Sequence, residues 1–130
     1  MRAKESSLQQ ECVRLFRMFY PDFAPLFFAV PNGSRREARE AARLKAEGVW
    51  PGVADMLLLV PRYGVPGVAI EFKTYDYKER KGRLERVPTN QSPAQREWQR
   101  AVEAQGYKYM VIRDAEEFIR CIHTYMNGQI

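Results

Sequence analysis

Three charged residues in the middle of the chain have the types and spacing to bind a metal ion. Glu71 and Lys73 stand two residues apart at the end of an apolar run, so in a β-strand their side chains leave the same face. Asp55 opens the preceding apolar run and can reach that face from an adjoining strand. Two carboxylates held close together repel each other unless a proton or a cation lies between them. The spacing therefore predicts that Asp55 and Glu71 bind a hard divalent cation such as Mg²⁺ or Mn²⁺.

Such a cation would favour phosphate chemistry. It would accept phosphate oxygens as ligands, lower the pKa of a bound water and stabilise the charge of a pentacovalent transition state. Lys73 could orient or help deprotonate that water and neutralise developing negative charge. On spacing alone a second interpretation stays open, because acid-x-Lys triplets are common. Glu71 and Lys73 could form a surface ion pair at a strand end, with Asp55 a loop residue.

Hydrophobic periodicity predicts a first helix over residues 6–20, which Pro21 ends. Glu5 lies one turn before Leu8 and Gln9, at the edge of the apolar stripe. Its carboxylate can therefore point toward the interior.

A short strand and a second helix follow. The bulky run 26–30 predicts a buried strand that ends in the turn 31–33. Residues 34–46 predict a helix, because Ser34 and Glu37 have capping-box spacing and Gly48 comes just past the end. Three alanines would form its packing face and three arginines a basic ridge: Ala38, Ala41 and Ala42 on the first, Arg36, Arg39 and Arg43 on the second.

The two segments that carry the candidate metal ligands are predicted to be central strands. Residues 54–60 and 68–73 are apolar almost throughout, and the lack of alternation in the first predicts burial on both faces. The segment 75–88 is polar and rich in Lys and Arg, and it is predicted to be a mobile loop.

The last part of the chain predicts a helix, a strand and a helix. Ser92 is an N-cap with Gln95 at the third helical position, and Gly106 ends that helix. Residues 107–112 predict a strand, and Asp114 caps a last helix with five apolar residues directed inward: Phe118, Ile119, Ile122, Tyr125 and Met126. The order α-β-α-β-β-α-β-α predicts a single α/β domain over residues 1–130, with a mixed central sheet flanked by helices.

These motifs resemble the VRR-NUC domain, the virus-type replication and repair branch of the PD-(D/E)XK nuclease superfamily. The resemblance covers most of the chain and rests on the segments 5–9, 31–33 with an Arg shortly after, 44–49, 51–55, 70–73, 92–95 with Trp98, and 106–107. The chain departs from the common pattern at Ser34, where Gly is frequent, and at Ala54, where Pro is frequent. Neither change removes a ligand, but Ala54 loosens the backbone constraint before Asp55. The resemblance implies a restriction-endonuclease-like fold.

The resemblance also implies roles for single residues. Metal ligation would fall to Asp55, Glu71 and the Phe72 backbone carbonyl, with Glu5 completing the acidic cluster directly or through a water, and catalysis to Lys73. Gln95 would support the site from the inward face of its helix, which it shares with Trp98 and Val102. A plain capping role for Gln95 fits its position equally well, and both roles can hold.

Basic residues away from this cluster are candidates for binding an anionic partner. The net charge of +5 favours such a partner. Candidate DNA-binding residues lie around the second helix and in the segment 75–88: Asn32, Arg35, Arg36, Arg39, Arg43, Lys45, Lys78, Arg80, Lys81, Arg83 and Arg86. Each alone also fits a solvated surface, whereas the set favours contacts with phosphates. No base-reading module accompanies them, which favours recognition of DNA shape over sequence.

The composition narrows the class of protein. A hydrophobic content of 45% is typical of a folded globular protein. No apolar run approaches the roughly 20 residues that cross a bilayer, and the N-terminus lacks the apolar stretch of a signal peptide.

Cys12 and Cys121 lie far apart without metal-site spacing, which favours reduced thiols. His123 lies away from every motif, which disfavours histidine-based nuclease chemistry. We expect a protein of the bacterial or phage-infected cytoplasm, without membrane partner or organic cofactor.

Together these features predict an Mg²⁺- or Mn²⁺-dependent endonuclease acting on DNA. Standalone VRR-NUC domains resemble small phage or bacterial junction-resolving nucleases of DNA repair and recombination, so the resemblance implies a branched substrate such as a flap or a four-way Holliday junction. Symmetric cutting of a junction would require a two-fold homodimer. One alternative is a DNA-binding protein whose metal site has decayed, which the intact Asp55, Glu71 and Lys73 oppose. The other is a sequence-specific restriction-type enzyme, for which the short chain leaves little room.

Overall fold

The structure is a computed structural model that describes residues 3–31 and 38–128. A four-stranded mixed sheet forms its centre, with the strands β1 (Phe27–Ala29), β2 (Met56–Leu58), β3 (Val68–Phe72) and β6 (Lys108–Ile112) in the order β1-β2-β3-β6. β1, β2 and β3 pair antiparallel, whereas β3 and β6 pair parallel. β2 and β3 are central strands, as predicted, and β3 is buried along its whole length.

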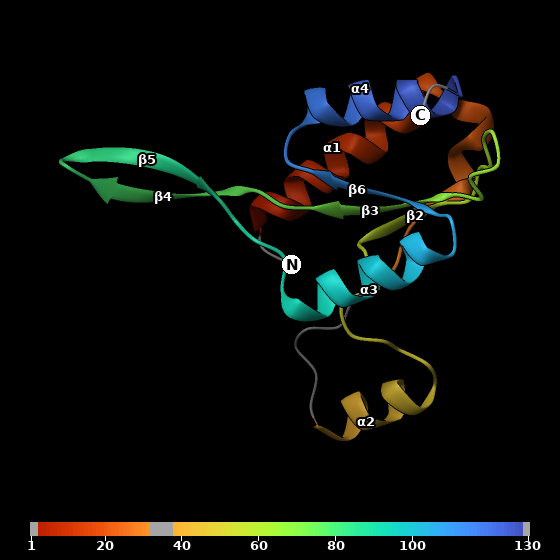
Figure 1. Ribbon diagram of the computed structural model, residues 1–130, viewed down its shortest axis with the longest axis horizontal. Coiled ribbons are helices and arrows are strands. Elements are labelled where there is room, and N and C mark those ends of the chain that lie inside the picture. The colour runs from red at the N-terminus through yellow and green to blue at the C-terminus, as the bar shows by residue number, and fades with distance from the viewer. Residues whose placement is uncertain (1–2, 32–37, 129–130) are drawn as a thin grey trace.

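Helices cover both faces of the sheet (Figure 1). α1 (Ala3–Phe19) and α4 (Ala115–Met126) lie on one face, and α3 (Pro93–Ala104) lies on the other. The 3-10 helix η1 (Pro21–Leu26) connects α1 to β1. α3 begins at the N-cap Ser92 with a complete capping box, and α4 begins at the N-cap Asp114, as predicted. The cap at Ser92 fixes the first turn of α3 beside the sheet.

The main core lies between the sheet and the pair of helices α1 and α4. Its largest fully buried side chains are Tyr125, Phe16, Phe72 and Phe118. Because successive side chains of a strand point to opposite faces, Phe72 and Ile70 of β3 enter this core while Glu71 points toward the α3 face. The alternation of β3 therefore directs one carboxylate away from the apolar core.

The segment predicted to be a mobile loop is instead a β-hairpin, so that prediction is wrong. β4 (Tyr75–Arg80) pairs antiparallel with β5 (Arg83–Pro88) in a separate two-stranded sheet. Lys81 and Gly82 join the strands with φ values of 53° and 75°, and positive φ at both turn residues matches the twist of a two-residue hairpin turn. Figure 1 shows the hairpin projecting from the body of the molecule. The predicted order of elements lacked these two strands.

The second helix is less packed than its alanines predicted. α2 (Ala38–Ala46) stands apart from the sheet, below α3 in Figure 1. The side chains of Ala41 and Ala42 are exposed, so these two residues of the predicted packing face do not pack. Methyl groups bury little apolar area, which leaves little free energy to hold a short helix against the body. Ser34 and Glu37, the predicted capping box, lie outside the described residues.

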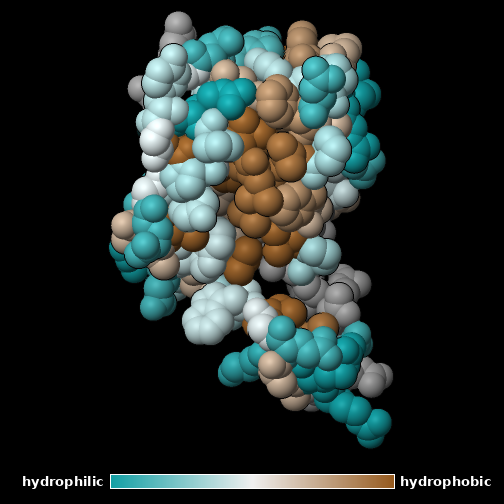
Figure 2. Space-filling view, turned by 90° about the vertical axis from the view of Figure 1, so that its right-hand side faces the viewer, coloured by the Kyte–Doolittle hydropathy of each residue, from teal (hydrophilic) through white to brown (hydrophobic). Residues whose placement is uncertain are grey.

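β1 is an edge strand, which corrects the prediction of a buried one. Phe27 is buried, but Phe28 is 38% exposed. Phe28 pairs with Leu57, and Leu59 N donates to Leu26 O, so these residues continue one face of the β1 and β2 pair. α3 lies against β6 and leaves this face open. Figure 2 shows an apolar area on one side of the molecule, above α2.

The cysteines and the histidine behave as the sequence indicated. Cys12 and Cys121 are free thiols, and burial raises the pKa of Cys12 to about 12. The Tyr20 hydroxyl hydrogen-bonds to Nδ1 of His123, whose ring also contacts Phe19. His123 is thus a structural residue. None of the helices in the described ranges is both long and apolar enough to cross a membrane.

Candidate active site

Asp55 occupies the point where three segments of the sheet meet. It directly precedes β2, and its backbone carbonyl accepts a hydrogen bond from Val30 N at 2.8 Å. Its side-chain Oδ2 accepts a hydrogen bond from Phe72 N at 2.8 Å. Asp55 therefore connects the chain after β1 to the end of β3, and it lies beside the Glu71-Phe72-Lys73 triplet, as predicted.

The approach to Asp55 is fixed by Gly52. Its φ is +80°, and a Cβ atom at this position would lie 2.4 Å from the carbonyl carbon and oxygen of Ala94 and 2.8 Å from Gln95 N. The loop thus touches the backbone in the first turn of α3 without any intervening side chain. Glycine is required both for the left-handed backbone and for the contact. This contact sets the position of Asp55 relative to α3.

Glu71 is completely buried, and one of its two carboxylate oxygens is unpartnered. Oε1 accepts hydrogen bonds from the Tyr109 hydroxyl at 2.5 Å and from Gln91 Nε2 at 3.3 Å. Gln91 Nε2 also donates to Gln99 Oε1 at 2.9 Å. Oε2 is buried and has no hydrogen-bond partner. The surface ion pair that spacing alone allowed is therefore wrong, because a fully buried Glu71 cannot form one.

Tyr109 reaches Glu71 because β3 and β6 are neighbours. It pairs in register with Ala69, two residues before Glu71, so its side chain leaves the sheet on the same face. The Trp98 ring lies edge-on to the Tyr109 ring at 6.2 Å between centroids. Burial raises the pKa of Tyr109 far above its usual range, and the hydrogen bond to Glu71 raises it further. The phenol therefore stays protonated and donates to the carboxylate.

The electrostatics of Asp55 favour a cation nearby. Burial raises its pKa above the usual value, while the hydrogen bond from Phe72 N lowers it. The negative charges of Glu71 and Glu5 raise the pKa again, and the Lys73 ammonium lowers it. The raised pKa means that the folded protein disfavours the charged form of Asp55. A divalent cation would reverse that preference.

A cleft of about 820 Å³ brings several predicted residues together. Glu5, Asp55, Phe72 and Gln95 all line it, and they come from α1, the start of β2, the end of β3 and the start of α3. Glu71 is not part of the lining, since it is buried. Lys73 is half-buried, and its backbone N–H donates to Ile112 O at 3.0 Å. Four of the predicted residues, from four elements, therefore meet at the cleft, and Lys73 is not among its lining residues.

Gln95 caps its own helix and also lies at the cleft. Its side-chain Oε1 accepts a hydrogen bond from Ser92 N at 2.8 Å, and its backbone N–H donates to Ser92 Oγ at 3.1 Å. The same residue lines the cleft. Its capping bonds therefore hold it in place at the cleft wall.

The residues present fit a divalent cation that keeps most of its water. Among the described residues there is no group of three or more His, Cys, Asp and Glu side chains placed to hold a metal. Mg²⁺ typically binds through one or two carboxylates and retains waters for the remaining positions. Asp55 and the unpartnered Oε2 of Glu71 supply that number of carboxylates. The Phe72 carbonyl is a further oxygen donor beside them.

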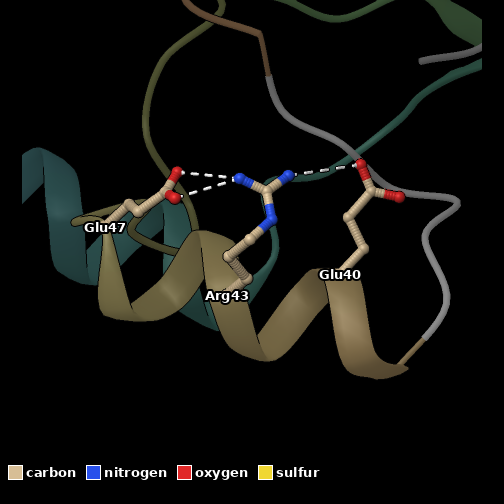
Figure 3. A network of polar contacts seen from close by, with 3 residues as sticks. All are labelled: Glu40, Arg43 and Glu47. Carbon is tan, nitrogen blue, oxygen red and sulfur yellow. Dashed lines mark hydrogen bonds and ion pairs between the residues drawn. The ribbon is translucent and has the colours of Figure 1, made fainter.

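The predicted DNA-binding residues fall on two separate projections. Arg39 and Lys45 are exposed on α2, and Lys78, Arg80, Lys81, Arg83 and Arg86 are exposed on the hairpin. Figure 1 shows these two elements at different ends of the molecule. Arg43 is held by acids of its own helix, at 3.8 Å from Glu40 and 3.0 Å from Glu47 (Figure 3). Asn32, Arg35 and Arg36 lie outside the described residues.

Five residues of the site were not identified from the sequence. Tyr109, Gln91 and Gln99 surround Glu71, whereas Arg14 and Arg17 line the cleft from α1. The two arginines could have been found from helical spacing, since they follow Gln10 at i+4 and i+7. No local signal marks the other three, because their proximity to Glu71 depends on how distant segments pair.

The mixed sheet, the flanking helices and the acid-x-Lys strand beside Asp55 define an α/β fold of the restriction-endonuclease-like class. A solved structure described as a VRR_NUC domain protein is similar to this chain, with a TM-score of 0.74 and 21% sequence identity, covering 98% of this chain and 92% of that one. No protein-family model and no curated protein sequence matches the chain. This structural similarity confirms the VRR-NUC fold that the sequence predicted.

Proposed function

We propose that residues 1–130 form one nuclease domain that hydrolyses phosphodiester bonds in DNA with Mg²⁺ or Mn²⁺. The observation that carries the proposal is the buried Glu71 carboxylate, which has one unpartnered oxygen and lies beside Asp55. A buried anionic oxygen without a partner is costly. Such an arrangement is typical of a site that binds a cation during function.

Each residue of the acidic cluster would have its own role in binding the metal or in catalysis. Asp55, Glu71 and the Phe72 carbonyl would hold the metal, with Glu5 at the cleft wall acting directly or through water. When bound, the metal would supply Lewis-acid polarisation of the phosphate and lower the pKa of water. Lys73 would orient the attacking water and offset negative charge at the phosphate.

Two arginines support binding of the DNA backbone close to these groups. Arg14 and Arg17 line the same cleft as Asp55, and both are exposed. An arginine guanidinium can form two parallel hydrogen bonds with a phosphate. The cleft can therefore seat a phosphodiester between the basic side of α1 and the acidic cluster.

We further propose that the substrate is branched DNA and that the protein acts as a homodimer. The VRR-NUC fold and the exposed apolar residues Leu26, Phe28 and Leu59 support this proposal. Large exposed apolar areas are typical of protein interfaces. Two copies related by a two-fold axis would present two sites to a symmetric junction.

The test is cleavage of labelled linear duplex, flap, fork and four-way junction of the same sequence, each with Mg²⁺, Mn²⁺ or EDTA. We expect cleavage of the branched substrates with either metal and none with EDTA. Sedimentation at micromolar concentration should show a dimer. Cleavage in EDTA would overturn the metal mechanism, and equal cutting of linear duplex would overturn branch selectivity. A monomer that cuts flaps alone would overturn the proposal that the protein resolves four-way junctions as a dimer.

Tyr109→Phe is expected to weaken metal binding by roughly 10- to 100-fold, the usual effect of removing a group that orients a metal ligand. The change deletes the 2.5 Å hydrogen bond to Glu71 Oε1 and keeps the ring. The measurement is the Mn²⁺ concentration that gives half-maximal cleavage, which should rise while kcat at saturating Mn²⁺ changes little. Tyr107→Phe is the control, because Tyr107 is 40% exposed. An unchanged Mn²⁺ requirement would show that Tyr109 does not position Glu71.

A further inference from the structure

The hairpin β4–β5 is attached firmly at its base. Thr89 donates to Thr74 O through both its backbone N at 3.1 Å and its Oγ1 at 2.9 Å. Arg113 donates to Thr74 O at 3.1 Å and to Thr89 O at 2.8 Å. The Tyr75 ring also contacts two guanidinium groups, with Arg86 at 4.0 Å and Arg113 at 5.6 Å from its centroid. The two strands therefore leave the body from a fixed root.

This root adjoins the candidate active site in sequence and in space. Thr74 follows Lys73 directly, so the hairpin begins as a continuation of the chain that carries Glu71. Arg113, which closes the root, follows β6, the strand that carries Tyr109. The direction of the hairpin is thus tied to the two strands that hold the Glu71 carboxylate.

The far half of the hairpin is exposed on both faces and carries basic and apolar side chains together. The residues from Tyr77 to Arg86 are all exposed. Leu84 is 74% exposed near the tip, and Tyr77 is 59% exposed. Leu84 pairs with Glu79, two residues after Tyr77, so Leu84 and Tyr77 lie on the same face of the ribbon. An isolated two-stranded hairpin is marginally stable in water. A projection that buries so little of its own surface is suited to a partner.

The charge of the hairpin favours an anionic partner. Five basic residues face three acidic ones in the segment 75–88, a net charge of +2. The tip is more basic than the average, because Arg80, Lys81 and Arg83 flank Gly82 without an acid among them. Arg80 pairs with Glu85 at 3.4 Å, which leaves Lys81 and Arg83 as the better candidates for external anions.

We propose that the β4–β5 hairpin lies in the major groove of a DNA duplex arm next to the cleaved bond. The inference rests on the proposed nuclease function and adds a requirement to its substrate. A two-stranded ribbon fits the major groove, whose floor offers apolar thymine methyl groups to Leu84 and whose edges offer phosphates to Lys81 and Arg83. Six residues per strand span about 20 Å, the length of about six base pairs.

The first experiment measures binding without cleavage, by fluorescence anisotropy of a labelled duplex in EDTA at several salt concentrations. Lys81→Asn with Arg83→Gln removes two charges and keeps a residue that accepts positive φ at position 81. We expect the slope of log association constant against log salt to become shallower by about 1.8, the value for two lost phosphate contacts. Arg100→Gln with Arg120→Gln is the matched control, since both side chains are exposed on other elements, and it should leave the slope unchanged.

Leu84→Ser separates groove insertion from simple attraction to phosphates. Groove insertion predicts weaker binding with an unchanged salt slope, because an apolar contact is lost and no charge is removed. Wild-type affinity for Leu84→Ser, or equal slopes for the two double variants, would overturn the proposal. A change of oligomeric state in the hairpin variants, seen by sedimentation, would also overturn it, because the partner would then be a second copy of the chain.

The second experiment measures cleavage of branched substrates whose arms are shortened stepwise. We expect cleavage by the wild-type protein to fall sharply once the arm is shorter than about six base pairs. The Lys81→Asn, Arg83→Gln variant should cut long and short arms at similar rates, and a variant that keeps the wild-type length dependence would contradict the proposal. If no substrate is cut at all, the nuclease function fails, while the anisotropy results still decide whether the hairpin binds DNA.

Discussion

Replacing Glu71 by glutamine is expected to lower the rate of DNA cleavage by roughly 10³-fold or more, equivalent to about 4 kcal/mol of transition-state stabilisation. Glutamine has nearly the same shape, so it can keep the contacts to Tyr109 and Gln91. It removes the negative charge. The unpartnered Oε2 is replaced by the amide nitrogen or the neutral amide oxygen of glutamine, and either atom binds a divalent cation weakly. The measurement is single-turnover cleavage of a four-way junction at saturating Mn²⁺.

Thermal unfolding gives a readout of Glu71→Gln that does not depend on cleavage. A metal that binds the folded protein stabilises it by about 2.7 kcal/mol when present at 100 times its Kd. Mn²⁺ should therefore raise the Tm of the wild-type protein and not that of Glu71→Gln. Glu103→Gln is the control, because Glu103 is exposed on α3. Cleavage retained in Glu71→Gln, or a Tm that still rises with Mn²⁺, would exclude Glu71 as a metal ligand.

Gly52→Ala is expected to destabilise the fold by more than about 3 kcal/mol, because it combines a strained backbone with a clash. The added methyl group would lie 2.4 Å from the Ala94 carbonyl group. Backbone atoms in the first turn of a helix cannot move aside as a flexible side chain can. The loop before Asp55 and the N-terminus of α3 would have to separate, and the cleft between them would change shape. The measurement is the free energy of unfolding from urea denaturation.

Gly64→Ala is a matched control for that substitution. Gly64 has a φ of +82°, close to the +80° of Gly52, but a Cβ atom there meets no heavy atom within 4 Å. It should destabilise by roughly 1–2 kcal/mol, the cost of the left-handed conformation alone. The difference between the two variants isolates the contact with α3. Equal destabilisation by both substitutions would show that this contact is not important.

Sequence periodicity predicted the parts of the site that depend on local geometry. The spacing of Glu71 and Lys73 predicted a strand, and the structure places Glu71 in β3 and Lys73 directly after it. The capping signal at Ser92 located the start of α3. The position of Glu5 followed from helical periodicity, and the structure places it at the cleft. These features depend on residues close together in the chain, so the sequence carries enough information to place them.

The remainder depends on contacts between distant segments. Tyr109 contacts Glu71 because β6 pairs parallel with β3, which no local pattern indicates. α2 has an amphipathic pattern, but whether its alanine face packs depends on the surface offered by the rest of the chain. The hairpin was missed for another reason, because a segment with so many charged residues is typical of a loop. The turn at Lys81 and Gly82, together with the flanking tyrosines and valine, was the signal that could have predicted the hairpin.

The closure at the root of the hairpin also bears on how the protein can change over evolution. Thr74 and Thr89 bring the chain back to the point it left, so the segment between them is an excursion that the core does not need for its connectivity. Changing the length of such a segment alters the entropy of loop closure only slowly, by about 0.6 kcal/mol per doubling. The length of the β4–β5 hairpin can therefore vary between descendants of this chain while the strands that carry Glu71 and Tyr109 stay in place.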